Sequence, residues 1–282
     1  MTHPNHPLQR VKEKLHNQLP EKHLEKISKR WIRLGHVLLI KIPQELEKHE
    51  KIIAKAFAET IPGVRTVAKP IKPVEGVSRT PNIHIIYGDK KTEVTHKENR
   101  CYYIFDVSKQ LFCPGNISER IRMAKTAMKN ETVVDLFAGI GQFTIPIAVH
   151  TGAAKVYACE INPQTYKYLR QNCKKNRVEK IVQPRLGHCV SVAPRRVADR
   201  VVMGLVKHTH LYLPLALETL KESGGIIHYH ETVPLHLINT RPFERVEKTA
   251  EKYGYKVSFL GITKVKRYAP GVEHIVLDAK LG

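Results

Sequence analysis

Hydrophobic and polar residues alternate in two different ways along this chain, and the change falls near residue 108. Before it, short apolar runs typical of strands stand beside amphipathic helical stretches. After it, apolar strand-like runs alternate regularly with helical stretches, which is typical of a doubly wound, mainly parallel sheet. The pattern predicts two domains, a smaller α+β module over residues 1–107 and an α/β domain over residues 108–282.

The first module is expected to combine helices with short strands. Its N-terminal stretch carries a loose apolar stripe interrupted by Pro20, and Pro43 ends the apolar run that begins at Trp31. The prolines within residues 69–76 predict a stiff loop. The expected elements are a helix within 11–30, a strand over 31–42, a helix over 45–60, and strands over 64–67, 83–87, 93–97 and 101–107.

The second domain is expected to contain the large sheet. Its first strand ends at Asp135, its second ends before Glu160, and its last two strands resemble an antiparallel pair that closes the sheet edge. A ligand of such a sheet binds at the carboxyl ends of the strands. The other expected elements are helices over 118–129, 145–148, 163–176, 209–221 and 241–253, and strands over 181–185, 199–206, 225–229, 256–260 and 274–278.

A glycine turn follows the first of these strands. Asp135 ends an apolar run, Gly139 and Gly141 come next, and a helical stretch begins near Thr144. Glycines let the backbone approach a ligand where a Cβ would clash. Glu160, at the tip of the next strand, is well placed to accept hydrogen bonds from ribose hydroxyls. The pattern predicts a nucleoside site, and the alternative is an ordinary strand–turn–helix unit with an acidic cap.

The acid at the start of the turn narrows the choice of ligand. The turn has fewer glycines than a dinucleotide-binding fingerprint, and the negative charge of Asp135 would repel a pyrophosphate. An acid suits a ligand with a positive charge, and S-adenosylmethionine carries both a sulfonium and an ammonium. The second domain therefore looks like a class I S-adenosylmethionine-dependent transferase with a Rossmann-like, mainly parallel sheet and an antiparallel last strand.

The end of the fourth strand disfavours one branch of this class. Enzymes that methylate a base nitrogen usually have Asn or Asp there, followed by proline and often an aromatic residue. In this chain the position reads Met203-Gly204-Leu205-Val206, with no side-chain acceptor and no ring for stacking. A standard base-methylating site is therefore incomplete.

The charge of the chain indicates a partner. Lysine and arginine outnumber aspartate and glutamate by 47 to 26, and the formal net charge of +21 favours a polyanion such as nucleic acid. No run predicts a membrane span or a signal peptide. Five scattered cysteines, none in a Cys-x-x-Cys pair, favour reduced thiols in a cytoplasmic protein and no zinc ribbon. Paired histidines such as His228 and His230 are more often polar contacts than ligands, so no metal is expected.

Several motifs between about residue 100 and the C-terminus carry a family resemblance. They lie at residues 106–109, 112–116, 119–120, 134–141, 203–204, 226–234 and 266–272. In them the sequence resembles the archaeal tRNA wybutosine-synthesising 3-amino-3-carboxypropyltransferases, which are related to the tRNA guanine-37 N1-methyltransferases. The resemblance implies that the chain uses S-adenosylmethionine as co-substrate.

The resemblance also implies a reaction. The 3-amino-3-carboxypropyl group would move to a carbon of the tricyclic base 4-demethylwyosine at tRNA position 37, and methylthioadenosine would be released. All three carbons on a sulfonium are activated, so the group transferred depends on which carbon is held in line with the nucleophile. Where methylating relatives have a catalytic arginine, this chain has Gly115, which again favours aminocarboxypropyl transfer.

Catalytic residues follow from the same resemblance. Turning the methionyl arm toward tRNA needs a cation near its carboxylate. Arg120 is the family-matched candidate, with Lys109 and Arg122 as helpers. Glu231 is a candidate base.

The implied cofactor site departs from the family at two positions. A thiol at Cys113 replaces a serine hydroxyl, and His188 replaces the acid expected at the adenine edge. Weaker cofactor binding is therefore expected, with Arg120 on the methionyl part and Glu160 on the ribose. The full expected set is Cys113, Arg120, Asp135, Phe137, Gly139, Gly141, Glu160, Ile161, Gly187, His188, Cys189 and Met203.

The expected partner is tRNA, bound at the anticodon loop around position 37 with help from the first module. Lys264, Lys266, Arg267 and Tyr268 form a basic, aromatic stretch that is either a tRNA contact or a solvated charge run. Two other functions stay open. One is N1-methylation of guanine-37, and the other is non-catalytic tRNA binding by a protein whose nucleotide pocket has decayed.

Overall fold

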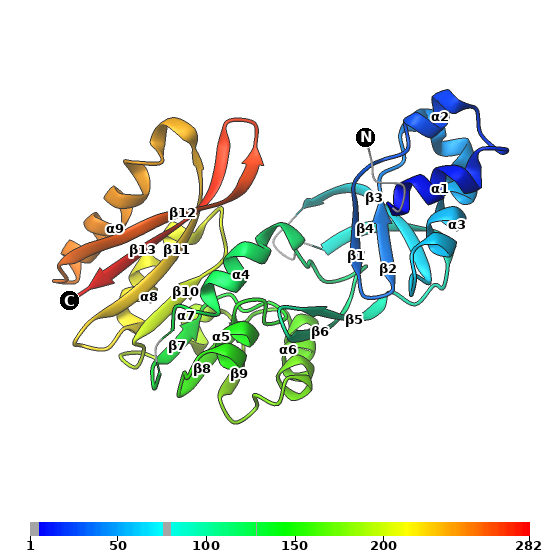
Figure 1. Cartoon of the computed structure of the whole chain (residues 1–282). Coiled ribbons are helices and arrows are strands. Elements are labelled where there is room, and N and C mark those ends of the chain that lie inside the picture. Colours follow the sequence, from blue (N-terminus) through cyan, green and yellow to red (C-terminus); the bar gives the residue numbers. More distant parts are fainter. Residues whose placement is uncertain (1–5, 76–79, 128) are drawn as a thin grey trace. The chain divides into compact units, whose positions relative to one another are not determined.

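Two compact units make up the chain (Figure 1). The computed structural model describes residues 6–75, 80–127 and 129–282. One unit runs to Glu98 and also takes in Tyr102–Phe112, and the other comprises Asn99–Cys101 and Cys113–Gly282. Each unit has its own sheet and its own apolar core.

The N-terminal unit packs helices onto a small sheet. Its four-stranded sheet has the order β1-β2-β3-β4, and a two-stranded sheet pairs β5 with β6. Val11, Leu15 and Phe57 are buried in one apolar cluster, as the stripes in the sequence predicted. The elements are α1 (Pro7–Leu15), α2 (Glu21–Glu25), β1 (Trp31–Leu34), β2 (Val37–Ile40), η1 (Gln44–His49), α3 (Glu50–Thr60), β3 (Thr66–Glu75), β4 (Thr80–Gly88), β5 (Glu93–Glu98) and β6 (Cys101–Asp106).

The single strand expected over residues 31–42 is wrong. The run forms two antiparallel strands, β1 and β2. Gly35 lies between them with a left-handed φ of 55°, and a Cβ there would meet the Val94 side chain at 2.8 Å. Glycine therefore allows both the reversal and the close approach.

The stiff loop expected over residues 69–76 is also wrong. β3 runs on to Glu75 and pairs with β4, although it contains Pro70. β2 accompanies β3 only as far as Ala68, so beyond that residue β3 is an edge strand, where proline is tolerated. Gly76, the last residue of the expected loop, lies outside the described residues.

The C-terminal unit contains a seven-stranded sheet in the order β12-β13-β11-β10-β7-β8-β9. The strands from β11 to β9 pair in parallel. β13 runs antiparallel between β11 and β12. This arrangement confirms the predicted fold class, with the antiparallel pair at the sheet edge.

The helices and strands of this unit follow the predicted order. The helix expected over 118–129 ends early, at Met123, and the strand expected over 225–229 continues to Pro234. The elements are η2 (Pro114–Asn116), α4 (Ile117–Met123), β7 (Thr132–Asp135), α5 (Thr144–His150), β8 (Lys155–Glu160), α6 (Pro163–Lys175), β9 (Val182–Leu186), α7 (Cys189–Val192), β10 (Arg200–Met203), η3 (Thr209–Tyr212), α8 (Leu213–Thr219), β11 (Gly225–Pro234), η4 (Leu235–Leu237), α9 (Arg241–Lys252), β12 (Val257–Ala269) and β13 (Val272–Leu281).

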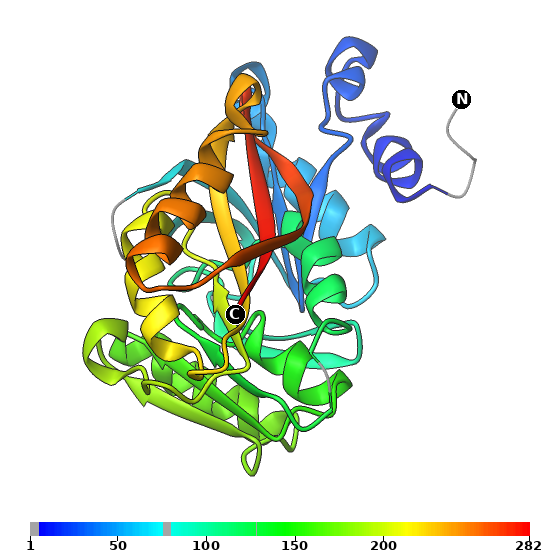
Figure 2. The ribbon, with the colours of Figure 1, turned by 90° about the vertical axis from the view of Figure 1, so that its left-hand side faces the viewer.

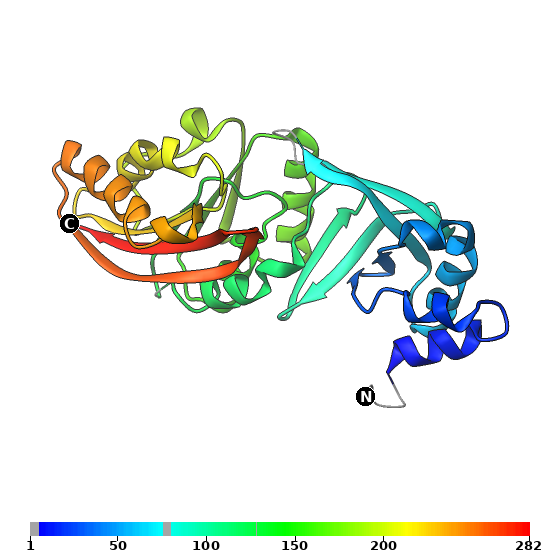
Figure 3. The ribbon, with the colours of Figure 1, turned by 90° about the horizontal axis from the view of Figure 1, so that it is seen from above.

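The two faces of the sheet differ in polarity along β11. α8 and α9 lie together on one side (Figures 2 and 3), and Ile227 and Tyr229 are buried in the apolar cluster there. Their neighbours His228 and His230 point to the opposite face, because side chains alternate along a strand. Among the described residues, no helix is long and apolar enough to cross a membrane.

Candidate cofactor site

Asp135 stands at the carboxyl end of β7 and is completely buried. Its Oδ1 accepts a hydrogen bond from the Phe137 amide at 3.2 Å, and its Oδ2 accepts one from the Thr144 hydroxyl at 2.8 Å. Burial raises the pKa of Asp135 to about 6, and the negative charge of Glu160 adds to the rise. The two hydrogen bonds therefore fix the position of the carboxylate, while burial makes its ionised form unfavourable.

Glu160 ends β8 and reaches the same turn. Its Oε2 accepts from the Gly139 amide at 2.9 Å, and its Oε1 accepts from the Asn162 amide at 2.7 Å. Burial raises the pKa of Glu160 as well. No lysine, arginine or histidine nitrogen of the described residues lies within 4.0 Å of Asp135 or Glu160. Two acids without a counter-cation fit a ligand that brings positive charge and hydroxyl donors.

The two glycines of the turn have different surroundings. A Cβ on Gly141 would lie 2.7 Å from Ile145 Cγ1 and 3.0 Å from Leu169 Cδ1, so this glycine allows the turn to pack on α5 and α6. A Cβ on Gly139 would have no atom of the described residues within 4 Å. Gly139 therefore leaves open space beside the two acids, as a close-fitting ligand requires.

An aromatic group lines the neighbouring strand ends. The Phe137 and Tyr212 rings meet edge to face with centroids 5.0 Å apart, and the Tyr212 hydroxyl lies 3.3 Å from His188 Nε2. His188 Nδ1 accepts from the Val190 amide at 3.3 Å, so the ring proton of the neutral imidazole resides on Nε2. Tyr212 was missed by the sequence analysis, because only the fold brings η3 beside the end of β9.

The remaining predicted cofactor residues lie around these groups. Gly187 donates its amide to the Glu160 carbonyl at 2.9 Å, and Ile161 is exposed beside it. Cys189 is buried, which raises the pKa of its thiol to about 11. Met203 is completely buried at the end of β10. The structure thus gathers most of the predicted set at the carboxyl ends of β7, β8, β9 and β10.

The loop before α4 is pinned to the glycine turn. Arg120 is 1% exposed, and its Nη1 donates to the Cys113 carbonyl at 2.9 Å and to Gln142 Oε1 at 3.3 Å. Gln142 Oε1 also accepts from the Cys113 amide at 3.4 Å. Gln142 directly follows Gly141, so it ties the loop to the turn. The sequence analysis did not single out Gln142, which matches no motif by itself.

Lys109 and Val206 need separate comment. Lys109 belongs to the N-terminal unit, where its ammonium lies 3.4 Å from Asp106 Oδ2. Val206, just after the end of β10, has a left-handed φ of 82° although it is β-branched. Such backbone strain concentrates at functional sites. It falls at the end of the strand where the sequence analysis looked for a substrate-binding motif.

Glu231 lies on the side of the sheet that faces α9. Its Oε1 accepts from Arg241 Nε at 2.7 Å and from Arg245 Nη1 at 2.6 Å, while its Oε2 accepts from the Tyr229 hydroxyl at 2.7 Å. The carboxylate is 2% exposed. This geometry makes Glu231 an internal counter-ion for two arginines, and not the open base that the sequence suggested.

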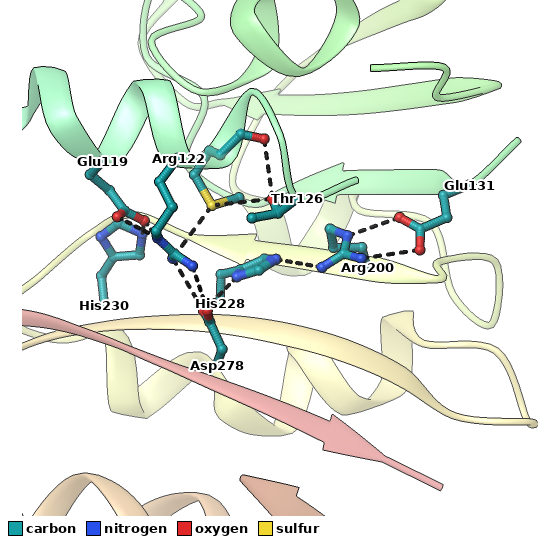
Figure 4. Close-up of polar contacts among 9 residues, drawn as sticks. Glu119, Arg122, Thr126, Glu131, Arg200, His228, His230 and Asp278 are labelled. Atoms are coloured by element: carbon teal, nitrogen blue, oxygen red, sulfur yellow. Dashed lines mark hydrogen bonds and ion pairs between the residues drawn. The ribbon is translucent and has the colours of Figure 1, made fainter. Parts of the chain in front are cut away.

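A chain of buried ionic contacts occupies the opposite face, under α4 (Figure 4). Arg122 is bound by Glu119 at 2.8 Å and by Asp278 at 2.5 Å, so it is not free to act as the expected helper at the methionyl arm. His228 Nδ1 donates to Asp278 Oδ1 at 2.6 Å, and its Nε2 lies 2.8 Å from Arg200 Nη1. Arginine can only donate, so Nε2 is the acceptor and His228 is neutral. Burial likewise lowers the pKa of His228.

Two family models match the sequence. Residues 94–258 match the TRM5/TYW2 methyltransferase domain, and residues 11–92 match the TYW2 N-terminal domain. Together the two models cover most of both structural units.

Individual relatives are similar over nearly the whole chain. The tRNA(Phe) (4-demethylwyosine(37)-C(7)) aminocarboxypropyltransferase of Pyrococcus horikoshii is 43% identical over 96% of each chain. The tRNA (guanine(37)-N(1))-methyltransferase Trm5b of Pyrococcus abyssi is 36% identical, over 88% of this chain and 73% of its own. The crystal structure of P. horikoshii TYW2 in complex with MeSAdo gives a TM-score of 0.87 at 42% identity, covering 97% of this chain and 98% of that chain.

Proposed function

Because the chain belongs to the TRM5/TYW2 methyltransferase-domain family, we propose that it is an S-adenosylmethionine-dependent tRNA aminocarboxypropyltransferase. Its product is tRNA in which a carbon of 4-demethylwyosine at position 37 carries the 3-amino-3-carboxypropyl group. The relative that is 43% identical is named for this reaction. The observation that carries the proposal is the pair of neighbouring acids, Asp135 and Glu160, which have no counter-cation among the described residues.

Each side of the site has a distinct task in this function. Glu160 retains acceptor capacity for ribose hydroxyls, since the amides of Gly139, Ile161 and Asn162 occupy only part of the roughly four acceptor sites of a carboxylate. Asp135 stabilises positive charge from beneath the glycine turn. Phe137, Tyr212 and His188 offer a ring-lined edge for the adenine.

S-adenosylmethionine supplies a sulfonium whose attached carbons are all electrophilic, and the protein selects one of them by position. Selecting the methionyl carbon requires that the arm, with its amine and carboxylate, be held toward the acceptor base. The end of β10 offers neither a side-chain acceptor nor a ring of the kind that base-methylating enzymes use, since Met203 is buried and Gly204 has no side chain. The site is therefore better suited to aminocarboxypropyl transfer than to methylation of guanine.

The proposed partner is tRNA, bound through the anticodon loop, with the N-terminal unit positioning it. The excess of basic residues supports a polyanion. Lys264, Arg267 and Tyr268 are exposed on β12 and are proposed to contact tRNA. We place the enzyme in the cytoplasm and assign no metal to its reaction.

N1-methylation of guanine-37 is the second candidate, favoured by the 36% identity to Trm5b. One experiment separates the candidates. S-adenosylmethionine labelled either in the methyl or in the carboxyl carbon is incubated with tRNA carrying 4-demethylwyosine. Carboxyl label in the tRNA, with methylthioadenosine released, is the expected result. Methyl label in the tRNA would make the protein a methyltransferase, and tRNA binding without either label would leave a binding protein.

A further inference from the structure

Lys266 reaches from the sheet edge into the loop that precedes α4. Its Nζ lies 2.7 Å from Cys113 Sγ, although the two residues are 153 positions apart. The register between β12 and β13 shifts between Lys264 and Lys266, and such a bulge re-aims the side chains that follow it. Lys264 remains exposed, whereas Lys266 is half-buried. The two lysines therefore differ in surroundings despite their proximity in the sequence.

Gly115 makes room for this approach. A Cβ on Gly115 would lie 3.2 Å from Lys266 Cδ and 3.7 Å from its Nζ. The aliphatic arm of the lysine thus lies directly over the bare backbone of the loop. A larger residue at position 115 would push against that arm.

The Lys266 ammonium has binding capacity to spare. Sulfur is a weak acceptor, and an ammonium has three donors. No carboxylate of the described residues lies within 4.0 Å of Lys266 Nζ. Arg120, the cation expected to bind the methionyl carboxylate, is instead buried and uses Nη1 to hold Cys113 and Gln142. Lys266 is therefore the better-placed cation for an anionic ligand.

The position of this ammonium matches the layout of the cofactor site. Cys113, which touches Lys266, donates its amide to Gln142, and Gln142 directly follows Gly141 of the glycine turn. Two contacts, Lys266 to Cys113 and Cys113 to Gln142, thus link the ammonium to the residue that follows the turn glycine. Asp135 and Glu160 provide negative charge at the ends of β7 and β8, where both accept hydrogen bonds from amides of the same turn. A ligand with a positive centre and a carboxylate on an adjacent arm would satisfy both.

We infer that Lys266 binds the carboxylate of the methionyl arm and so selects the group that is transferred. The inference rests on the proposed function, in which that arm leaves the cofactor. Cys113 acts as the rest position of the ammonium, and Arg120 positions the loop. Lys266 is thus a specificity-determining residue, and only part of the predicted basic stretch remains available to tRNA.

Calorimetric titration with three ligands tests this inference. S-adenosylmethionine has the carboxylate, decarboxylated S-adenosylmethionine lacks only that group, and methylthioadenosine lacks the whole arm. Lys266→Met keeps the aliphatic arm and removes the charge. It should weaken binding of S-adenosylmethionine about tenfold or more, the scale of a lost charge-assisted hydrogen bond, and change the other two less than about twofold.

Matched variants guard against a merely structural effect. Lys264→Met removes a charge from the same strand and should leave all three affinities unchanged. Lys266→Arg should recover most of the affinity for S-adenosylmethionine. Gly115→Ala keeps the lysine but crowds its arm, and should give a smaller loss confined to the ligand with the carboxylate. This last variant also keeps the test valid if Lys266→Met does not fold.

Two outcomes would overturn the inference. One is unchanged affinity of Lys266→Met for S-adenosylmethionine, and the other is an equal loss for all three ligands, which would mean that the lysine only shapes the loop. The proposed function is tested separately by the labelled co-substrate. Suppose that methyl label is transferred to the tRNA while Lys266→Met still loses affinity only for S-adenosylmethionine. The proposed function would then be refuted, and the role of Lys266 in binding the carboxylate would stand.

Discussion

The C-terminal unit removes carboxylates from water in two regions, and the two regions stabilise the negative charge in different ways. At the glycine turn, Asp135 and Glu160 accept hydrogen bonds from amide and hydroxyl donors and have no cationic partner in the part of the chain that the structure describes. Under α4, Asp278 has an arginine and a histidine as partners (Figure 4). A buried acid without a cation is unfavourable in the ligand-free protein. The comparison teaches that the acids at the turn suit a ligand that brings positive charge, whereas Asp278 under α4 already has its partners within the protein.

The pKa values of two aspartates, one in each region, measure the difference between the regions. Burial raises the pKa of Asp135 to about 6. Burial acts in the same direction on Asp278, but the hydrogen bonds from His228 and Arg122, together with the positive charge of Arg122, outweigh it and lower its pKa to about 2. The same residue type is therefore destabilising when charged in one place and stabilising in the other.

Asp135→Asn should have the largest effect, and it should fall on binding. Losing the charge next to the ligand's positive centre should weaken S-adenosylmethionine binding about 100-fold, the upper range for a hydrogen bond to a charged group. The melting temperature at pH 7 should not fall, because a folded-state pKa of about 6 means that ionising the acid destabilises the fold progressively above the unfolded value of 3.8 and fully above about pH 6. Calorimetry and thermal unfolding on one sample measure both. A fall in stability with unchanged affinity would reverse the comparison.

Asp278→Asn should reduce stability and leave the binding of S-adenosylmethionine unchanged. It should lower the free energy of unfolding by about 2 kcal/mol, since a pKa depressed by nearly two units is worth about that much. The stabilisation is present above the unfolded pKa and is lost as pH falls toward 2, so the gap from the wild type should narrow below about pH 4. Urea unfolding at several pH values measures it.

The control for Asp278 is Glu222→Gln, which removes an exposed ion pair with Arg196. That variant should change stability by less than about 0.5 kcal/mol. An Asp278→Asn variant that bound S-adenosylmethionine much more weakly, at unchanged stability, would mean that the chain under α4 belongs to the site.

Gly141 and Gly139 of the turn differ in the same way, since substitution of the first should affect stability and substitution of the second should affect binding. Gly141→Ala should destabilise the fold by about 1–3 kcal/mol, because the new methyl meets Ile145 and Leu169 at a left-handed φ of 96°. Gly139 has a left-handed φ of 57°, and an added Cβ would meet open space. Gly139→Ala should therefore lower the free energy of unfolding by only about 1 kcal/mol, the cost of a left-handed alanine, but it should reduce ligand affinity. Urea unfolding and calorimetric titration of both variants measure the change in stability and the change in ligand affinity. Equal effects of both variants on stability would mean that Gly139 is also packed.

The sequence analysis succeeded where the relevant residues are close along the chain. The strand, acid and glycines around Asp135 form a local pattern, and a parallel sheet brings successive strand ends to one edge, which placed Glu160 correctly. The alternation of strands and helices likewise predicted the sheet. The N-terminal hairpin at Gly35 was missed because a single glycine inside an apolar run also fits an uninterrupted strand with a bulge.

The contacts that the sequence could not predict join distant residues. Arg122 and Asp278 are 156 positions apart, and Lys266 and Cys113 are 153 apart. No local periodicity encodes such pairs, and a bulge decides which way Lys266 points. The ion pairs of Glu231 could not be predicted for the same reason, since its arginine partners lie on a separate helix.

Asp135 has no cationic partner among residues 6–75, 80–127 and 129–282, and this also couples ligand binding to the release of a proton. Near pH 6 the side chain is about half protonated in the ligand-free protein. A positive centre placed next to it lowers its pKa, so the proton leaves as the ligand arrives. The affinity for S-adenosylmethionine therefore rises with pH through this range, while a neutral nucleoside gains less. A fall in pH therefore weakens the binding of S-adenosylmethionine more than that of methylthioadenosine, the product that lacks the charged arm.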